Sequence, residues 1–136
     1  MKIISLIVIA LAAAQFAWCQ PGDDTLRFYL SKSNMVIAGE MQEGICSTSS
    51  FQACSFSIRV DEAFKGGAVR GDIVAFQTES FWGDYALPCH AEHAKCIVFL
   101  TPGKETGHWK VADPWFGMQN YSSFLATSIK RTLGAG

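Results

Sequence analysis

The sequence lacks a surplus of basic residues. It carries 11 Lys and Arg against 12 Asp and Glu over 136 residues, a formal net charge of -1. The basic residues are scattered from Lys2 to Arg131, and only the pair Lys130-Arg131 is adjacent. Because a protein that binds a phosphate backbone needs a clustered basic surface, the composition excludes nucleic acid as a partner.

The common catalytic patterns are also missing. The chain has no Gly-x-Ser-x-Gly elbow, and its histidine motif reads His90-Ala91-Glu92-His93 rather than the His-Glu-x-x-His of metalloproteases. Glu79, Asp84 and Glu92 could supply a carboxylate pair, but the sequence does not set their separation. We therefore expect a protein that is not an enzyme, with a small hydrolase as a remaining alternative.

No apolar run is long enough to cross a bilayer comfortably. The longest, Ile3–Ala14, follows a single lysine and precedes small residues. This pattern predicts a secretory signal peptide over residues 1–19. Cleavage after Cys19 is favoured over cleavage after Ala17, and the bulky Trp18 argues against a lipoprotein site. We expect a secreted or periplasmic protein with no membrane span after cleavage.

Four cysteines remain after that cleavage, namely Cys46, Cys54, Cys89 and Cys96. An even number of cysteines in an oxidising compartment predicts two disulfides. Three connectivities are possible. We favour Cys46–Cys54 and Cys89–Cys96, because each pair closes a short loop that ends where a strand begins.

The fold class follows from alternating apolar and polar residues. Phe56, Ile58 and Val60 alternate with polar neighbours, which is typical of a half-buried strand. Cys96–Leu100 is a nearly continuous apolar run, which indicates a central strand covered on both faces. Gly39, inside another apolar run, predicts a bulge that curves the sheet. The five expected strands are Val36–Met41, Cys54–Phe64, Asp72–Gln77, Cys96–Leu100 and His108–Asp113.

Two helices complete the expected layout. Asp24 can cap a short helix that buries Leu26, Tyr29 and Leu30, and Asn120 can cap a final helix. The apolar stripe of the final helix is Tyr121, Leu125 and Ile129, with Phe124 beside it and Leu133 at its end. Glu43–Ala53 and Glu79–Lys95 are predicted to be loops. Residues 20–33 then form a leader and short helix, and residues 34–136 form a mainly β domain, a five-stranded antiparallel OB-like barrel or a sandwich.

The order of these segments resembles netrin-like domains, the group that includes the tissue inhibitors of metalloproteinases. The step Phe64-Lys65-Gly66 before a strand led by Gly71-Asp72 looks like that family's second-to-third strand connection. Asp113-Pro114-Trp115-Phe116-Gly117 before a helix looks like the ending of uncharacterised exported bacterial proteins of the same layout. The resemblance covers residues 34–133 and implies a five-stranded OB-type barrel.

The resemblance does not carry the inhibitory role with it. Tissue inhibitors bind a protease zinc through an N-terminal cysteine in a Cys-x-Cys start, which this chain lacks. Cys19 is the one candidate for such a residue. A protein similar to metalloproteinase inhibitors is therefore kept only as a further alternative.

Two stretches could form a site. His90 and His93 lie three residues apart between Cys89 and Cys96 and could bind zinc or copper, although an exported disulfide loop with solvated histidines is the favoured reading. Exposed aromatic residues often mark interaction surfaces, and Phe81, Trp82 and Tyr85 lie in the long loop. We expect a secreted, disulfide-stabilised binding module without a cofactor, whose partner is an extracellular or periplasmic protein or a glycan.

Overall fold

The computed structural model of the chain describes residues 23–46, 52–81, 89, 91–113 and 116–135. The expected signal peptide over residues 1–19 lies outside the described residues. The elements, in chain order, are α2 (Asp23–Lys32), β1 (Met35–Cys46), β2 (Gln52–Lys65), β3 (Ile73–Phe81), β4 (Lys95–Pro102), β5 (Trp109–Val111), β6 (Met118–Asn120) and α3 (Ser123–Ala135). Neither of the described helices has the length and apolar character needed to cross a membrane.

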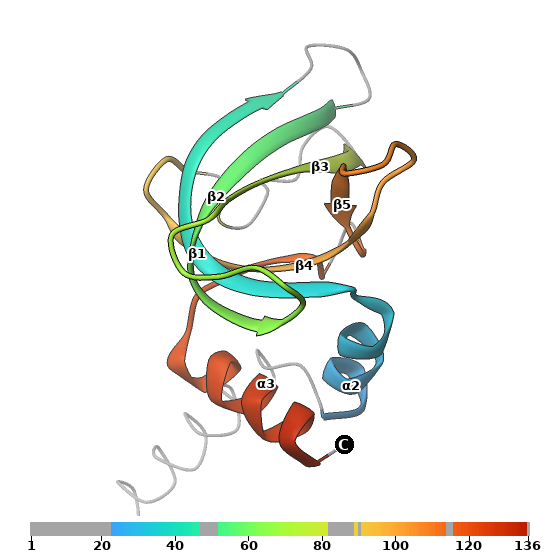
Figure 1. Cartoon of the computed structure of the whole chain (residues 1–136), viewed down its shortest axis with the longest axis vertical. Coiled ribbons are helices and arrows are strands. Elements are labelled where there is room, and N and C mark those ends of the chain that lie inside the picture. Colours follow the sequence, from blue (N-terminus) through green and yellow to red (C-terminus); the bar gives the residue numbers. More distant parts are fainter. Residues whose placement is uncertain (1–22, 47–51, 82–88, 90, 114–115, 136) are drawn as a thin grey trace, which may run out of the picture.

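Strands β1 to β5 close into a barrel, which confirms the expected OB-like fold (Figure 1). The strands pair in the order β1-β2-β3-β5-β4, and β4 pairs again with β1. The expectation of a wholly antiparallel barrel was wrong, because β3 and β5 run parallel. A closed ring with an odd number of strands cannot alternate in direction all the way round, so a five-stranded barrel must contain a parallel pair.

The alternation in β2 fills the barrel as predicted. Phe56, Ile58 and Val60 are at most 4% exposed and belong to the core inside the barrel, whereas Ser55 and Arg59 face outward. The remaining buried members of this core are Met35, Ile37, Met41, Cys54, Val74, Phe76, Cys89, Cys96, Val98, Leu100, Val111 and Met118. The period of two in the sequence therefore predicted the inward face of β2 correctly.

Gly39 lies at a bulge in β1, also as predicted. The register of β1 against β2 shifts between Ala38 and Gly39. A side chain at position 39 would collide with the backbone carbonyl of Arg59, so the two strands approach as closely as they do because this residue is a glycine. The bulge lets the long strand β1 bend far enough to pair with β2 along one edge and with β4 along the other.

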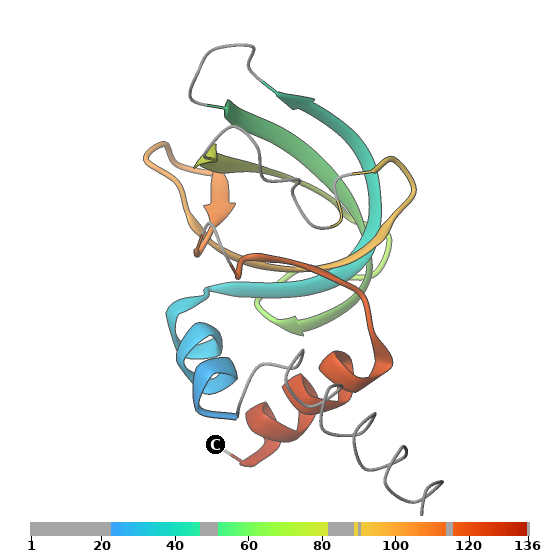
Figure 2. The same ribbon diagram turned by 180° about the vertical axis from the view of Figure 1, so that it is seen from behind.

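A second core lies between the barrel wall and the two helices, which sit together below the barrel in Figure 1 and are seen from behind in Figure 2. Its fully buried wall residues come from β1 and β4, and its helical residues come from one face of each helix. They are Val36, Ala38, Ile97, Phe99, Leu26, Leu30, Leu125, Ala126 and Ile129. Because this core covers the outer face of β4 while the barrel interior covers its inner face, the expected doubly buried strand at Cys96–Leu100 is confirmed.

The helix ends differ in part from the prediction. Helix α3 is capped by Ser122, whose hydroxyl oxygen accepts the Leu125 amide at 3.0 Å, while Asn120 belongs to β6 and pairs with β4. The prediction of Asn120 as the cap was wrong, because strand pairing takes priority for that residue. At the other helix, Lys65 at the end of β2 donates to the Leu30 carbonyl at 2.8 Å and so satisfies a free acceptor near the C-terminus of α2.

The hairpin of β1 and β2 is longer than predicted. The expected loop at Glu43–Ala53 instead contributes the end of β1, where Glu43 pairs with Ser57 and Ile45 pairs with Ser55. Strand β3 likewise continues to Phe81, into the expected loop at Glu79–Lys95. Gly44 and the serines and threonine that follow Cys46 predicted a loop over Glu43–Ala53, but pairing with β2 supports strand structure at Glu43–Cys46 despite the weak strand propensity of glycine and glutamate.

Strands β5 and β6 lie along one edge of β4 like a single strand with an insertion. Leu100 and Val98 are two residues apart on β4, whereas their partners Val111 and Met118 are seven apart. The excursion between those partners brings Phe116 onto α2, where it stacks on Tyr29 with ring centroids 4.2 Å apart.

Asp113 holds this excursion in shape. Its side chain accepts the Phe116 amide at 3.0 Å, and its backbone carbonyl accepts the Gly117 amide at 2.7 Å. Its carboxylate also accepts a hydrogen bond from the Tyr29 hydroxyl. Burial raises the pKa of Tyr29, and the Asp113 carboxylate raises it further. Asp113 and Phe116 therefore anchor α2 to the barrel, and Pro114 and Trp115 lie outside the described residues.

Candidate binding surface

The helices leave one part of the barrel exposed, which we call the outer wall. Adjacent β1, β2 and β3 place three rows of outward-facing residues there, as set by the strand register. The rows are Ile45–Ser55–Gln77, Glu43–Ser57–Ala75 and Glu40–Arg59–Ile73. Most of these side chains are small or uncharged, and Ser57 and Ala75 at the centre have short side chains. Ile45 and Ile73, 73% and 59% exposed, add apolar area at opposite corners.

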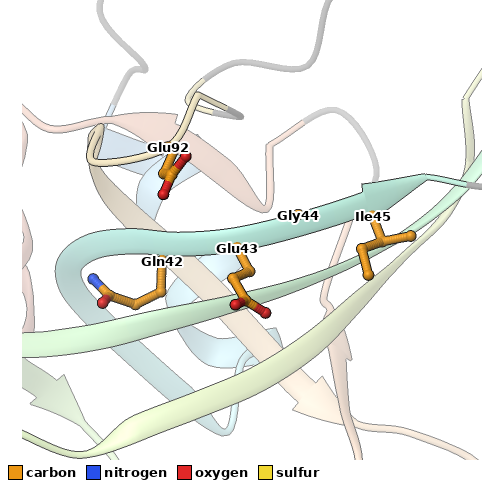
Figure 3. A pocket seen from close by; sticks show the side chains of 5 residues that line it. All are labelled: Gln42, Glu43, Gly44, Ile45 and Glu92. Atoms are coloured by element: carbon orange, nitrogen blue, oxygen red, sulfur yellow. The ribbon is translucent and has the colours of Figure 1, made fainter.

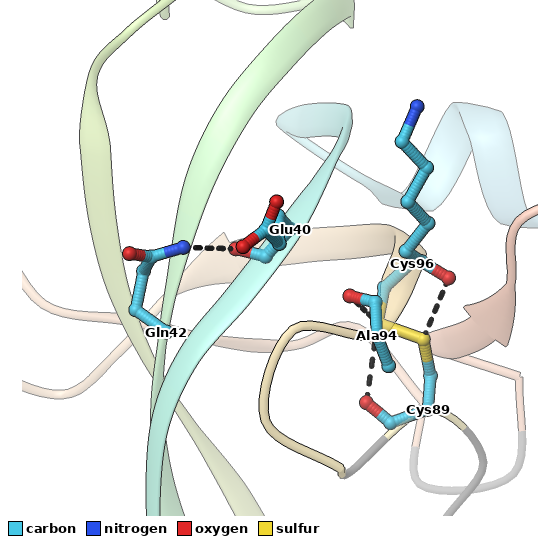
Figure 4. The surroundings of a disulfide bond; sticks show 6 residues. Glu40, Gln42, Cys89, Ala94 and Cys96 are labelled. Carbon is cyan, nitrogen blue, oxygen red and sulfur yellow. Dashed lines mark hydrogen bonds between the residues drawn. A yellow bond between two sulfur atoms is a disulfide. The ribbon is translucent and has the colours of Figure 1, made fainter.

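A disulfide-closed loop stands beside this wall. Cys89 and Cys96 are bonded, as predicted, and both side chains lie in the barrel core (Figure 4). Two backbone hydrogen bonds join the loop to β1, from the His93 amide to the Met41 carbonyl at 2.8 Å and from the Met41 amide to the Ala94 carbonyl at 2.9 Å. Covalent and hydrogen-bonded attachment together fix the loop against the strand.

The backbone of this loop is held in an uncommon conformation at two positions. Cys89 and His93 have φ angles of 63° and 68°, in the left-handed region that side chains with a Cβ rarely adopt. Such a conformation persists only where surrounding contacts enforce it, here the disulfide and the two hydrogen bonds to Met41. It directs the His93 ring toward β1.

His93 meets a charged network at this point. Its Nδ1 atom lies 2.8 Å from Glu40 Oε1, its Nε2 atom lies 3.6 Å from Glu92 Oε1, and Arg59 Nη2 lies 3.2 Å from Glu40 Oε2. The hydrogen bond from His93 lowers the pKa of Glu40, and the positive charge of Arg59 lowers it further. Glu40 is therefore ionised at neutral pH and links the loop to β2.

An open hollow of about 470 Å³ lies along β1 beside this network, and we call it the edge groove (Figure 3). Gln42, Glu43, Gly44 and Ile45 of β1 form one side, and Glu92 of the disulfide loop faces them. The hollow is within the size range of ligand sites, about 300–1,000 Å³, although it is open to solvent. Since Glu43 and Ile45 also belong to the outer wall, the two features form one continuous surface.

The residues expected to form a site fall largely outside the described part of the chain. This holds for Trp82, Tyr85 and His90 altogether, and for Phe81 only the backbone is described, as the last residue of β3 paired with Gln52. The aromatic surface at Phe81, Trp82 and Tyr85 therefore stays a prediction.

His93, the described half of the expected metal site, is exposed and has a carboxylate near each ring nitrogen. Zinc or copper bound at Nδ1 of His93 would displace the hydrogen bond to Glu40, whereas a metal bound at Nε2 would leave that hydrogen bond in place. Within the described residues, no group of three His, Cys, Asp or Glu side chains is placed to hold a metal ion.

The second expected disulfide is supported at one end. Cys54 is disulfide-bonded and buried, and the ladder of β1 and β2 places Cys46 directly opposite it. The side chain of Cys46 lies outside the described residues, so the pairing of Cys46 with Cys54 stays a prediction.

The sequence did not indicate the edge groove. Its two sides, Gln42–Ile45 and Glu92, are far apart in the chain, and no sequence pattern links them. The outer wall did have a signal, since the polar residues alternating with Phe56, Ile58 and Val60 predict a solvent-facing side of β2.

Comparison with known proteins leaves the chain without an assigned family. No protein-family model matches the sequence, and no curated protein matches it at a significant level.

Proposed function

We propose that this protein is an exported, non-enzymatic binding module, stabilised by disulfides, that recognises a protein or a glycan through its outer wall and edge groove. One observation carries the proposal. The helices α2 and α3 cover the outer face of β4, the start of β1 at Val36 and Ala38, and the end of β2 at Glu62–Lys65, whereas no described element covers the outward faces of β2 at Ser55–Arg59 and of β3 at Ile73–Gln77. Ser55, Ile73, Ala75 and Gln77 on this wall are exposed to solvent.

The chemistry of the wall favours recognition of another surface. Ser55, Ser57 and Gln77 offer hydrogen-bonding groups, and Ala75 lets a ligand approach the sheet closely. OB-type barrels bind oligosaccharides and other ligands on the face of their second and third strands, which here are β2 and β3. This likeness concerns the fold alone, so the residues on the wall carry the argument.

Export is proposed from the N-terminal sequence and from cysteine usage. The apolar run after Lys2 has the form of a signal peptide. A disulfide between Cys89 and Cys96 is consistent with an oxidising compartment. The kinship with netrin-like domains is also a proposal, and the closed five-stranded barrel followed by a helix supports it.

The test uses variants that place a bulky charge at the centre of the wall. The purified protein, its Ser57→Arg variant and its Ala75→Arg variant are screened against a glycan array and a displayed peptide library. Phe124→Arg is the matched control, because Phe124 is 52% exposed on α3, away from the wall. We expect each wall variant to lose the ligands of the wild type by at least about tenfold, about 1.4 kcal/mol, and the control to keep them.

Ligands that bind both wall variants as tightly as the wild type would contradict the assignment of the wall. Turnover of a bound ligand would contradict the non-enzymatic part of the proposal. Circular dichroism of every variant confirms that the barrel is folded before binding is compared.

A further inference from the structure

Along the edge of β1 beside the groove, backbone groups have no partner strand among the described residues. The pairing of β1 with β4 ends at Glu40, which faces Lys95, and the disulfide loop then takes up both backbone groups of Met41. Gln42 lies at a register shift, and from Glu43 to Ile45 β1 pairs with β2 along one edge; within the described part of the chain the other edge of Gln42–Ile45 has no partner strand. Such an edge can accept an additional strand.

The groove gives that edge a defined shape. Glu92 faces the strand across the hollow of about 470 Å³, and its loop is fixed by the Cys89–Cys96 disulfide. A segment entering along β1 would therefore lie between a strand edge and a rigid rim. Binding to a preformed site loses less conformational entropy than binding to a flexible one.

The charge of the groove selects among possible segments. Glu43 and Glu92 are both exposed, and neither forms an ion pair with a Lys or Arg of the described residues. A basic side chain would be attracted to both carboxylates, whereas an acidic one would be repelled. A second copy of this chain, paired edge to edge, would bring like charges together, which disfavours self-association.

The pleat of the strand sets the spacing that a partner must have. Glu43 and Ile45 both face the outer wall and are two residues apart on β1. A paired strand presents side chains to the same face at the same spacing of two residues. A partner strand that places a basic residue opposite Glu43 therefore places the residue two positions away opposite Ile45, where an apolar side chain fits.

We propose that the free edge of β1 at Gln42–Ile45 accepts an extended segment of a partner protein as an additional strand, with Lys or Arg beside Glu43 and Glu92 and an apolar side chain against Ile45. The inference rests on the binding function proposed above and names the partner as a basic, extended polypeptide. Main-chain hydrogen bonds supply part of the affinity, and the two side-chain contacts supply the specificity.

Short synthetic peptides test the inference on the purified full-length mature chain. One peptide carries Lys and Val in turn on the same face, two residues apart, as in Lys-x-Val-x-Lys-x-Val. Its counterpart has Glu in place of Lys. Calorimetry and amide chemical-shift mapping then report affinity and location. We expect the Lys peptide to bind at least about tenfold more tightly than the Glu peptide, with shifts and exchange protection at Gln42–Ile45.

Charge reversal and backbone methylation probe the two parts of the mechanism. The double variant Glu43→Lys, Glu92→Lys should reverse the preference toward the Glu peptide, while Glu105→Lys, a charge change in the turn before β5, should not. N-methylation of alternate peptide amides should abolish binding in one register and spare it in the other, because an added strand directs every second amide toward β1.

The inference would be overturned by equal affinity for both peptides, by chemical shifts that map elsewhere, or by effects of N-methylation that do not alternate along the peptide. A concentration-dependent dimer that Glu43→Lys alters would overturn it in favour of a second copy as the occupant. If the peptides fail while the wall variants still lose their selected ligands, the strand-addition inference fails and the binding function stands. If the wall variants also keep those ligands, the proposed function fails with it.

Discussion

Removing the Cys89–Cys96 disulfide should lower the free energy of unfolding by about 2.5 kcal/mol. The bond joins residues that are seven apart in sequence. Closing a loop of that length in the unfolded chain removes about 8 cal/mol/K of entropy, which gives the stated figure at 25 °C. Because Cys96 is fully buried, replacement by alanine adds a packing loss of about 1 kcal/mol at most.

Urea unfolding of the wild type, Cys89→Ala, Cys96→Ala and the double variant separates these contributions. All three variants remove the same cross-link. The free energies of unfolding of the two single variants and the double variant should therefore lie within about 1 kcal/mol of each other. A loss below about 0.5 kcal/mol in Cys89→Ala would refute the reasoning. That outcome would mean that residues 89–96 are already compact in the unfolded chain, so that the cross-link removes little entropy from it.

Three further changes test other parts of the structure. Gly39→Ala should cost about 1–3 kcal/mol in urea unfolding, because its Cβ would collide with the neighbouring strand, whereas Gly67→Ala, which meets no atom, should be nearly neutral. Ile129→Ala, which empties the core under α3, should cost about 2–5 kcal/mol in the same assay, and a loss below about 1 kcal/mol would contradict the packing of that helix. Because the hydrogen bond from His93 lowers the pKa of Glu40, the stability it contributes is present above the ordinary glutamate pKa of about 4.3 and is lost as the pH falls through the lowered value. Glu40→Gln should therefore flatten the acid side of a plot of unfolding midpoint against pH, and an unchanged acid side would rule out this contribution.

The strands could be read from the sequence where burial is regular. Phe56, Ile58 and Val60 alternate cleanly because one face of β2 fills the barrel, and Cys96–Leu100 is apolar throughout because both faces of β4 are covered. Gly39 was informative for the same reason, since a glycine inside an apolar run has few explanations other than a close approach of backbone.

The parts that were missed depend on tertiary context. The end of β1 at Glu43–Cys46 has loop-like composition, and its pairing with β2 gives it strand structure. The short strand β6 forms only because the excursion before it returns the chain to the edge of β4. The edge groove is defined by where β4 stops pairing with β1, and no local pattern in the sequence marks that point.

The contact between β3 and β5 has a mechanical consequence for the whole molecule. Only two residue pairs register there, Phe76 with Trp109 and Gln77 with Lys110, fewer than at any other described junction of the ring. Because the contact with the fewest paired residues opens most readily, we expect transient opening of the barrel to begin between β3 and β5. The Trp109 side chain, which packs against the barrel core, opposes this opening. The hairpin of β1 and β2 that carries the groove is joined by ten residue pairs, so we expect it to keep its shape when the contact between β3 and β5 opens.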